Sequence, residues 1–180
     1  MCVRIISMDI QILGEDSLRI KTKKTALVID PKAAIQKLEA DAILLTAGVG
    51  DTSRVTDYRV VIDGIGEYEV SGLKIISMKS EDDLVFALVS ENVRVLVAKA
   101  SSLKKISIEK IGDCQIVVIN ADDDLSESAI TAVEPRIIVL YGLKAKETAK
   151  ALGKEEIVVS SKTSFAEDKL PEETQVIVLG

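Results

Sequence analysis

Short runs of isoleucine, valine and leucine, many of them alternating with polar residues, recur along this chain and constrain its fold most strongly. Alternation with a period of two is typical of strands with one buried face, and unbroken apolar runs of strands buried on both. The pattern therefore predicts a β-rich α/β domain. Strands are expected over residues 5–13, 17–21, 25–29, 42–46, 58–62, 67–70, 73–78, 84–89, 93–98, 115–119, 136–140, 157–160 and 175–179.

Helices are expected between some of these strands. Asp30 can cap a helix and Pro31 suits its first turn, where the missing N–H costs nothing, so a helix is expected over residues 33–38. Residues 25–46 would then form a β-α-β unit. Further helices are expected over residues 107–111, 126–133 (ending near Pro135) and 144–152.

A weak internal repeat divides the chain. Residues 5–8 (IISM) recur at 75–78, and each copy precedes two alternating strands, a helical stretch and an apolar strand. This order predicts one domain over residues 1–180 with two pseudo-symmetric halves, about 1–72 and 73–180. Two such halves favour two sheets packed face to face with helices outside.

Composition excludes several classes of function. The net charge of -6 disfavours nucleic acid and anionic membranes as partners. Cys2 and Cys114 form no metal or disulfide pattern, and Cys114 is expected to be a buried apolar filler. We expect neither a signal peptide nor a membrane span, and hence a cytoplasmic protein. Histidine is absent, which excludes histidine general bases, Ser–His or Cys–His pairs and histidine-bound metals.

Four segments resemble a known family. Residues 12–20 (ILGEDSLRI) and 27–31 (LVIDP) are similar to LGHS-x-F-x-I and ILIDP, and residues 41–52 (DAILLTAGVGDT) to DAVLLTHxHxDH. Residues 61–72 (VIDGIGEYEVSG) resemble VIDGPGEYEVKG, the most specific match. These motifs belong to small bacterial proteins described as Zn-dependent hydrolases of the metallo-β-lactamase fold. The resemblance implies a four-layer αββα sandwich.

The resemblance also locates the positions at which the family holds its metal. Of the HxHxDH loop only the aspartate, Asp51, is present, and the bridging aspartate and late histidine of the second half fall near Ala100 and Gly142. The vestigial metal-site positions implied by the resemblance are Glu15, Ala47, Val49, Asp51, Thr52, Ala100 and Gly142.

A catalytic zinc needs about three N, S or O ligands and a bound water whose pKa it lowers to about 7. Methyl and isopropyl groups at positions 47 and 49 offer no lone pairs. We therefore expect no catalytic residue, no metal and no cofactor. The leading interpretation is a catalytically inactive binding or structural module that self-associates or binds a protein partner. The alternatives are a metal-dependent hydrolase with a reworked carboxylate site and a small-ligand sensor that uses the vacated pocket.

Other residues allow further hypotheses. The loop over residues 48–53 is either an anion-binding nest or a family loop retained for its backbone shape. The acidic run 122–124 either recruits a basic partner or complements a helix dipole, and the dipole is the simpler explanation. Five carboxylates could bind Mg²⁺ or Mn²⁺, or could serve as caps, turns and solvated groups: Glu15, Asp30, Asp51, Asp63 and Glu67. A Ser/Lys catalytic pair, or simply a solvated loop, could come from Lys99, Ser101, Ser102, Lys104 and Lys105.

Overall fold

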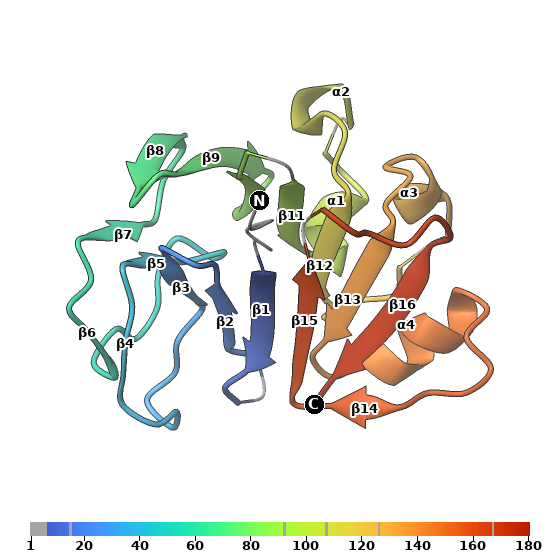
Figure 1. Ribbon diagram of the computed structural model, residues 1–180, viewed down its shortest axis with the longest axis horizontal. Coiled ribbons are helices and arrows are strands. Elements are labelled where there is room, and N and C mark those ends of the chain that lie inside the picture. The colour runs from blue at the N-terminus through green and yellow to red at the C-terminus, as the bar shows by residue number, and fades with distance from the viewer. Residues whose placement is uncertain (1–6, 15, 92, 107, 126, 167) are drawn as a thin grey trace, which may run out of the picture.

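Two β-sheets packed face to face form the centre of the molecule (Figure 1). The computed structural model describes residues 7–14, 16–91, 93–106, 108–125, 127–166 and 168–180. The first sheet has the strand order β15-β1-β2-β3-β5-β7, and the second has the order β14-β16-β13-β12-β11-β10-β9-β8.

The strands of the first sheet are β1 (Ser7–Ile12), β2 (Leu18–Lys21), β3 (Ala26–Ile29), β5 (Ala42–Leu44), β7 (Val60–Ile62) and β15 (Lys162–Ala166). Those of the second are β8 (Gly66–Val70), β9 (Leu73–Ser80), β10 (Asp83–Val89), β11 (Arg94–Lys99), β12 (Ile116–Asn120), β13 (Ile137–Tyr141), β14 (Val159–Ser160) and β16 (Gln175–Leu179). A separate short pair consists of β4 (Leu38–Glu39) and β6 (Val55–Thr56). The helices are α1 (Ala100–Leu103), α2 (Ile108–Ile111), α3 (Glu127–Thr131) and α4 (Ala145–Ala151).

The two sheets share one internal topology. Strands β1, β2 and β3 pair antiparallel, and β3, β5 and β7 then pair parallel. Strands β9, β10 and β11 likewise pair antiparallel before β11, β12 and β13 pair parallel. The two series therefore correspond strand for strand, and the described part of the repeated tetrapeptide begins β1 in one series and lies within β9 in the other.

The chain halves and the sheets do not divide at the same point. Strand β8 lies before residue 72 yet pairs with β9 of the second sheet, and β15, from the late part of the chain, pairs with β1 of the first. Strand β15 was not predicted, because its sequence KTSFA carries little apolar signal and its residues are half exposed or exposed. Backbone hydrogen bonds to β1, rather than burial of its side chains, hold this strand in the sheet.

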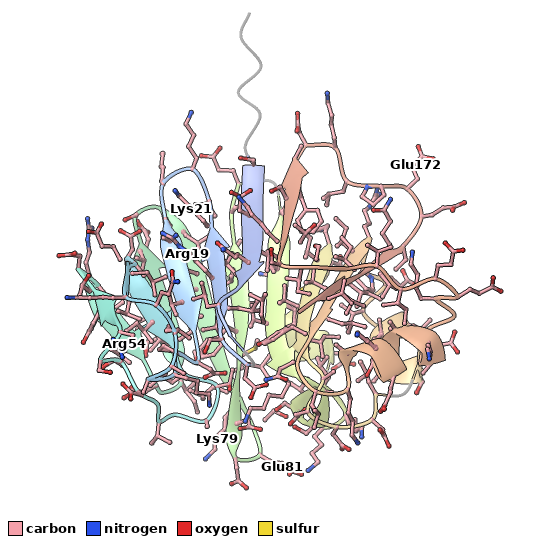
Figure 2. All side chains as sticks on the ribbon, turned by 90° about the horizontal axis from the view of Figure 1, so that it is seen from below. Arg19, Lys21, Arg54, Lys79, Glu81 and Glu172 are labelled. Carbon is pink, nitrogen blue, oxygen red and sulfur yellow. The ribbon has the colours of Figure 1, made fainter. Side chains whose placement is uncertain are left out.

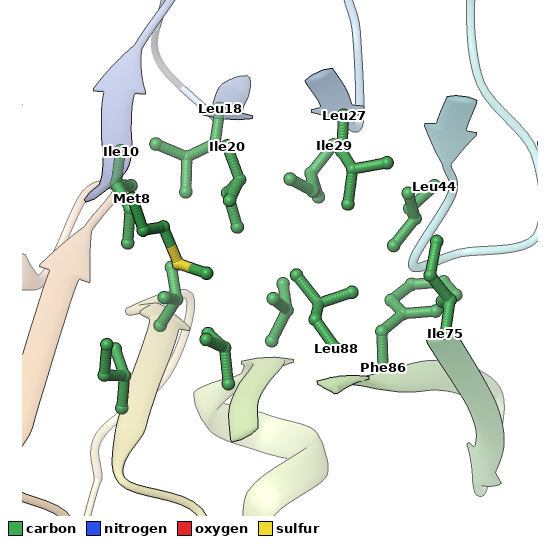
Figure 3. Close-up of a cluster of buried hydrophobic side chains, with 14 of the residues drawn as sticks. Met8, Ile10, Leu18, Ile20, Leu27, Ile29, Leu44, Ile75, Phe86 and Leu88 are labelled. Carbon is green, nitrogen blue, oxygen red and sulfur yellow. The ribbon is translucent and has the colours of Figure 1, made fainter. Parts of the chain in front are cut away.

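The core between the sheets comes from alternate residues of each strand. Met8, Ile10 and Leu44 of the first sheet face Phe86 and Leu88 of the second (Figure 3). The intervening residues of the central strands in the second sheet, which include Val85 and Leu96, face the helices on its outer side. Strands β12 and β13 are buried on both faces, which explains their unbroken apolar sequences. Labelled charged side chains such as Arg54, Lys79 and Glu172 project from the periphery (Figure 2).

The helix expected over residues 33–38 is absent, and this prediction was wrong. Asp30 has φ 47°, in the left-handed region, whereas a residue that caps a helix N-terminus is extended. Its carboxylate accepts hydrogen bonds from Thr46 rather than from a helix that follows it. Residues 33–35 form a turn, and β4 begins at Leu38. The outer face of the first sheet is therefore covered by the β4/β6 pair and its loops, with Ala40 and Val55 packed on Ile43.

The later helices are shorter than predicted. The structure has helix α2 within residues 107–111, although Ser107 lies outside the described residues. Helix α3 ends at Thr131, four residues before Pro135, where the sequence had predicted its end. Helix α4 lies within the predicted range 144–152. No helix of the described chain is long and apolar enough to cross a membrane.

Cys114 is buried, as predicted, and we expect it to be chemically inert in the folded protein. Burial raises the pKa of its thiol to about 11, so little thiolate exists at neutral pH. Cys2 lies outside the described residues, so a Cys2→Ser variant isolates the Cys114 signal. That variant should react with a thiol reagent only as fast as it unfolds. Rapid reaction of the folded variant would contradict the buried position.

Candidate functional site

A cavity of about 260 Å³ opens at the ends of strands from both sheets. Asp30 and Thr46 follow β3 and β5, whereas Lys99 and Asn120 are the last residues of β11 and β12. Ligand sites of α/β folds commonly lie at the carboxyl ends of parallel strands. The cavity is lined by Asp16, Asp30, Pro31, Lys32, Thr46, Ala47, Val49, Gly50, Asp51, Lys99, Asn120 and Asp122.

Asp30 is the most enclosed acid of this cavity. Its two carboxylate oxygens accept hydrogen bonds from the Thr46 amide at 2.8 Å and the Thr46 hydroxyl at 2.6 Å. Burial raises the pKa of Asp30 above its usual value, an effect that outweighs the two hydrogen bonds and the nearby Lys99 and Lys32. Asp30 thus ties the end of β3 to the end of β5 and leaves an incompletely compensated negative charge in the cavity.

Lys99 lines the same cavity, but a partner outside the cavity lining holds its charge. Its Nζ lies 2.8 Å from Asp83 Oδ1, and both side chains are largely buried. The Ser102 hydroxyl donates to the other oxygen of Asp83 at 3.2 Å. This cation is therefore largely neutralised by Asp83.

Asp122 also lines the cavity and is held by Ser101 of α1. Its oxygens accept hydrogen bonds from the Ser101 amide at 3.1 Å and the Ser101 hydroxyl at 2.7 Å. The next two acids of the run bind lysines: Asp123 pairs with Lys104 at 2.8 Å, and Asp124 with Lys144 at 3.0 Å. Helix α3 spans Glu127–Thr131. The acidic run makes side-chain contacts to other elements, and its complementarity to the helix dipole stays a prediction.

Two buried polar oxygens near these acids have no hydrogen-bond partner among the described residues: Asn120 Oδ1 and Tyr141 Oη. Asn120 is 6% exposed and Tyr141 is 0% exposed. Burial raises the pKa of the Tyr141 phenol well above its usual range, and the charges of Asp30, Asp16 and Asp122 raise it further. The phenol therefore ends among three carboxylates that line the cavity. Asn120 Nδ2 reaches Asp16 Oδ1 only at 3.4 Å, which makes a weak hydrogen bond.

The structure brings part of the predicted metal-site set together. Ala47, Val49 and Asp51 line the cavity, whereas Thr52, Ala100 and Gly142 do not belong to its lining. Ala100 is a buried residue at the start of α1. Glu15 lies outside the described residues. Asp51 is exposed and accepts a hydrogen bond from the amide of Ser53 in its own loop, which helps to lower its pKa.

These residues do not fit a zinc centre. In the described chain no group of three His, Cys, Asp or Glu side chains is arranged to hold a metal ion. The backbone at Gly142 also departs from what a ligand would need. Its φ is +89°, and a Cβ there would lie 2.3 Å from Asn120 Oδ1. A histidine at this position would therefore be strained and would collide with Asn120.

The alternative metal site is not assembled either. Asp30 and Asp51 line the cavity, but Asp63 and Glu67 are not part of its lining, and Glu67 pairs with Lys74 at 2.8 Å. The loop over residues 48–53 uses two of its own amides internally: Gly48 N donates to Leu45 O, and Ser53 N donates to Asp51. This bonding favours the retained-shape interpretation over an anion nest.

The lysines of the suggested Ser/Lys pair are all engaged in ion pairs. Lys104 binds Asp123, Lys105 binds Glu81, and Lys99 binds Asp83. Hydrogen bonding to Glu81 raises the pKa of Lys105, so it stays protonated at neutral pH. A protonated lysine cannot serve as a general base.

Sequence reasoning missed four residues of this site, namely Asp16, Lys99 in this role, Asn120 and Asp122. A usable signal existed. Lys99 and Asn120 end the apolar strands of the second half just as Asp30 and Thr46 follow those of the first. Reading the polar residue after each buried parallel strand would have placed most of this set at one edge.

The comparisons with known proteins agree with this architecture. A protein from Thermotoga maritima, assigned to the Zn-dependent hydrolases of the metallo-β-lactamase superfamily, superposes with a TM-score of 0.76. The two sequences are 18% identical, and the match covers 96% of this chain and 98% of that one. The chain has the metallo-β-lactamase fold.

Two further metallo-β-lactamase-fold structures extend the likeness. The metallo hydrolase Igni18 from Ignicoccus hospitalis has a TM-score of 0.61 at 10% identity, covering 88% of this chain and 98% of that one. The metallo-β-lactamase-fold protein YhfI from Bacillus subtilis has a TM-score of 0.58 at 9% identity, covering 89% and 99%. No family model and no curated protein matches the sequence. At these identities the likeness shows the fold alone.

Proposed function

We propose that this protein is a metallo-β-lactamase-fold module without zinc-dependent hydrolase activity, which acts by binding rather than by catalysis. The observation that carries the proposal is the chemistry of the loop after β5, where Ala47 and Val49 face the cavity in place of metal ligands. The left-handed backbone at Gly142, where a histidine would be strained, supports it as well. A fold does not fix a function, and this core is held by apolar side chains from both sheets rather than by a metal.

Metal analysis and stability measurements test this proposal together. The purified protein should contain much less than one equivalent of zinc, manganese or iron. Its urea-unfolding midpoint should be the same with and without EDTA, because the sandwich does not depend on a metal for its core. Stoichiometric metal together with chelator-sensitive hydrolysis of an ester or phosphodiester would instead support the carboxylate-site hydrolase.

Restoring the histidines of the loop after β5 should not restore a zinc enzyme. In the triple variant Ala47→His, Val49→His and Thr52→His, we expect no metal-dependent hydrolysis above that of the wild type. The second half still offers no ligand at Ala100 or Gly142, and a catalytic zinc needs about three protein ligands held in place. Zinc content and hydrolysis of a chromogenic ester, measured side by side, check this. A metal-dependent rate in the variant but not in the wild type would contradict it.

Within the binding class, the cavity favours a small ligand over a purely structural role. It remains open, at about 260 Å³, and polar groups line much of it. A protein partner or self-association is the other binding mode, and light scattering on a size-exclusion column tests self-association. A strict monomer that binds a small molecule in the cavity would favour the sensor.

A further inference from the structure

The cavity at the strand ends combines an excess of negative charge with a buried acceptor, Asn120 Oδ1, that has no donor among the described residues. We propose that it binds the ammonium group of a small primary amine that carries a short apolar chain. This inference rests on the proposed binding function and names the chemical class of its ligand.

The sign of the charge selects a cation. Four aspartates line the cavity against two lysines, Lys32 and Lys99. Lys99 is paired with Asp83, which is not part of the lining, so its charge does little to offset the four acids. An anionic ligand would meet four aspartates against Lys32 and the paired Lys99, so like-charge repulsion opposes its binding.

An unpartnered oxygen in the cavity lining favours a ligand that donates hydrogen bonds. Asn120 Oδ1 and Tyr141 Oη are both buried and lack a partner in the described chain, and a buried polar atom without a partner costs about 1–3 kcal/mol. The Asn120 oxygen can accept an N–H, and Asn120 lines the cavity, whereas Tyr141 is fully buried and is not part of the lining. An ammonium that replaces the long 3.4 Å contact between Asn120 and Asp16 would donate to Asn120 Oδ1 and would pair with the carboxylates around it.

The shape and lining of the cavity select an organic cation over a bare metal ion. A space of about 260 Å³ exceeds the roughly 30 Å³ that one water occupies in the liquid. No metal-holding group of three acidic or sulfur ligands occurs in the described residues. Pro31, Ala47 and Val49 line the cavity as well, and Val49 is 77% exposed. An apolar chain attached to the ammonium would cover these side chains.

Asp30 is the acid that would gain most from such a ligand. Burial raises its pKa because no cation fully compensates the ionised form. A bound ammonium would supply that compensation. The hydrogen bonds from Thr46 already fix the carboxylate in place, so binding would require little reorganisation of this residue.

Titration with butylamine tests the proposal, with butanol and butyrate as controls of equal chain length, and Mg²⁺ and Mn²⁺ as bare cations. The readouts are isothermal titration and backbone-amide chemical shifts. We expect saturable binding of butylammonium, with shifts confined to residues around the cavity, and no saturable binding of the others. Equal binding of butanol would mean that charge plays no part, and tighter binding of Mg²⁺ or Mn²⁺ would mean a metal site. Either result would overturn the proposal, as would no binding of any probe.

Two variants locate the site. Asn120→Leu removes the unpartnered acceptor of the lining and should weaken butylammonium binding about tenfold. Asp122→Asn removes one charge from the lining and should also weaken it several-fold. Asp113→Asn, which removes an exposed aspartate outside the lining, is the matched control and should leave binding unchanged. Circular dichroism confirms that each variant is folded. Equal weakening by Asp122→Asn and Asp113→Asn would show that only net charge matters, and unchanged binding in Asn120→Leu would show that the acceptor plays no part; either result would overturn the assignment to this cavity.

The outcomes separate this inference from the function on which it rests. A metal-free, inactive protein that ignores butylammonium would refute the amine site alone. A protein with stoichiometric metal and chelator-sensitive hydrolysis would refute the binding function itself, whatever the amine does.

Discussion

Replacing Asp30 by alanine is expected to lower the free energy of unfolding by about 2–3 kcal/mol. The Thr46 amide and hydroxyl, which donate to Asp30 at 2.8 and 2.6 Å, would both lose their acceptor. Thr46 is 1% exposed, so water would not readily replace the lost carboxylate as its hydrogen-bond acceptor. The left-handed φ of 47° also suits aspartate better than alanine. Urea unfolding followed by circular dichroism measures the change.

Two control variants separate this contact from a general effect of charge. Asp51→Ala removes an exposed aspartate of the same cavity and should leave stability nearly unchanged. Asp30→Asn keeps an acceptor for Thr46 and should cost less than Asp30→Ala. If Asp30→Ala were no more destabilising than Asp51→Ala, the bridge from β3 to β5 would not hold the two strand ends together.

The pH dependence of Asp30→Asn follows from the direction of the shift. Because burial raises the pKa of Asp30 above 3.8, the folded state holds this proton more tightly than the unfolded state. The favourable contribution of Asp30 is therefore complete below pH 3.8 and is lost as the pH rises through the raised folded-state pKa. Relative to the wild type, Asp30→Asn should thus become more stable as the pH rises from 3.8 through the folded-state pKa. A relative loss over that interval would show that ionised Asp30 is stabilised instead.

Truncating Phe86 to alanine should destabilise the protein by about 3–5 kcal/mol, the largest effect that we expect from a single substitution. Phe86 is fully buried in β10 and lies between the sheets among side chains that include Ile75 and Leu44 (Figure 3). Removing the ring leaves a cavity that strands paired on both sides of β10 cannot readily collapse to fill.

Leu143→Ala is the control for the loss of Phe86. Leu143 is 95% exposed and should contribute less than about 0.5 kcal/mol. The unfolding midpoint and its denaturant dependence should be measured for both variants. A small loss on Phe86→Ala would mean that the two sheets do not form one close-packed core.

Most strands could be predicted because burial on one or both faces leaves a direct record in side-chain polarity. Strands β12 and β13 needed only their unbroken apolar runs, and β2 its alternation. The helix over residues 33–38 failed for a different reason. Capping residues are a local signal, and a tertiary contact from Asp30 to Thr46 overrode it. Strand β15 had no comparable signal, since its order comes from backbone pairing with β1.

The candidate site shows the same division. The absence of histidine is complete in the sequence and by itself excludes every imidazole-based mechanism. The sequence also places Ala47, Val49 and Asp51 on one loop. It could not show that Asn120 and Tyr141 end unpartnered beside Asp16 and Asp30, because these residues are far apart in the chain and meet only through strand order.

The type of each side chain follows from the sequence, so the sequence alone determined the absence of histidine ligands, the net negative charge and the apolar strands of the core. The tertiary structure alone decided which charges meet. Lys99 forms an ion pair with Asp83, and Asp122 and Asp30 accept hydrogen bonds from Ser101 and Thr46. The physical reason is that charge pairing and hydrogen bonding depend on separations of a few ångströms between strand ends, which no local pattern of residues encodes.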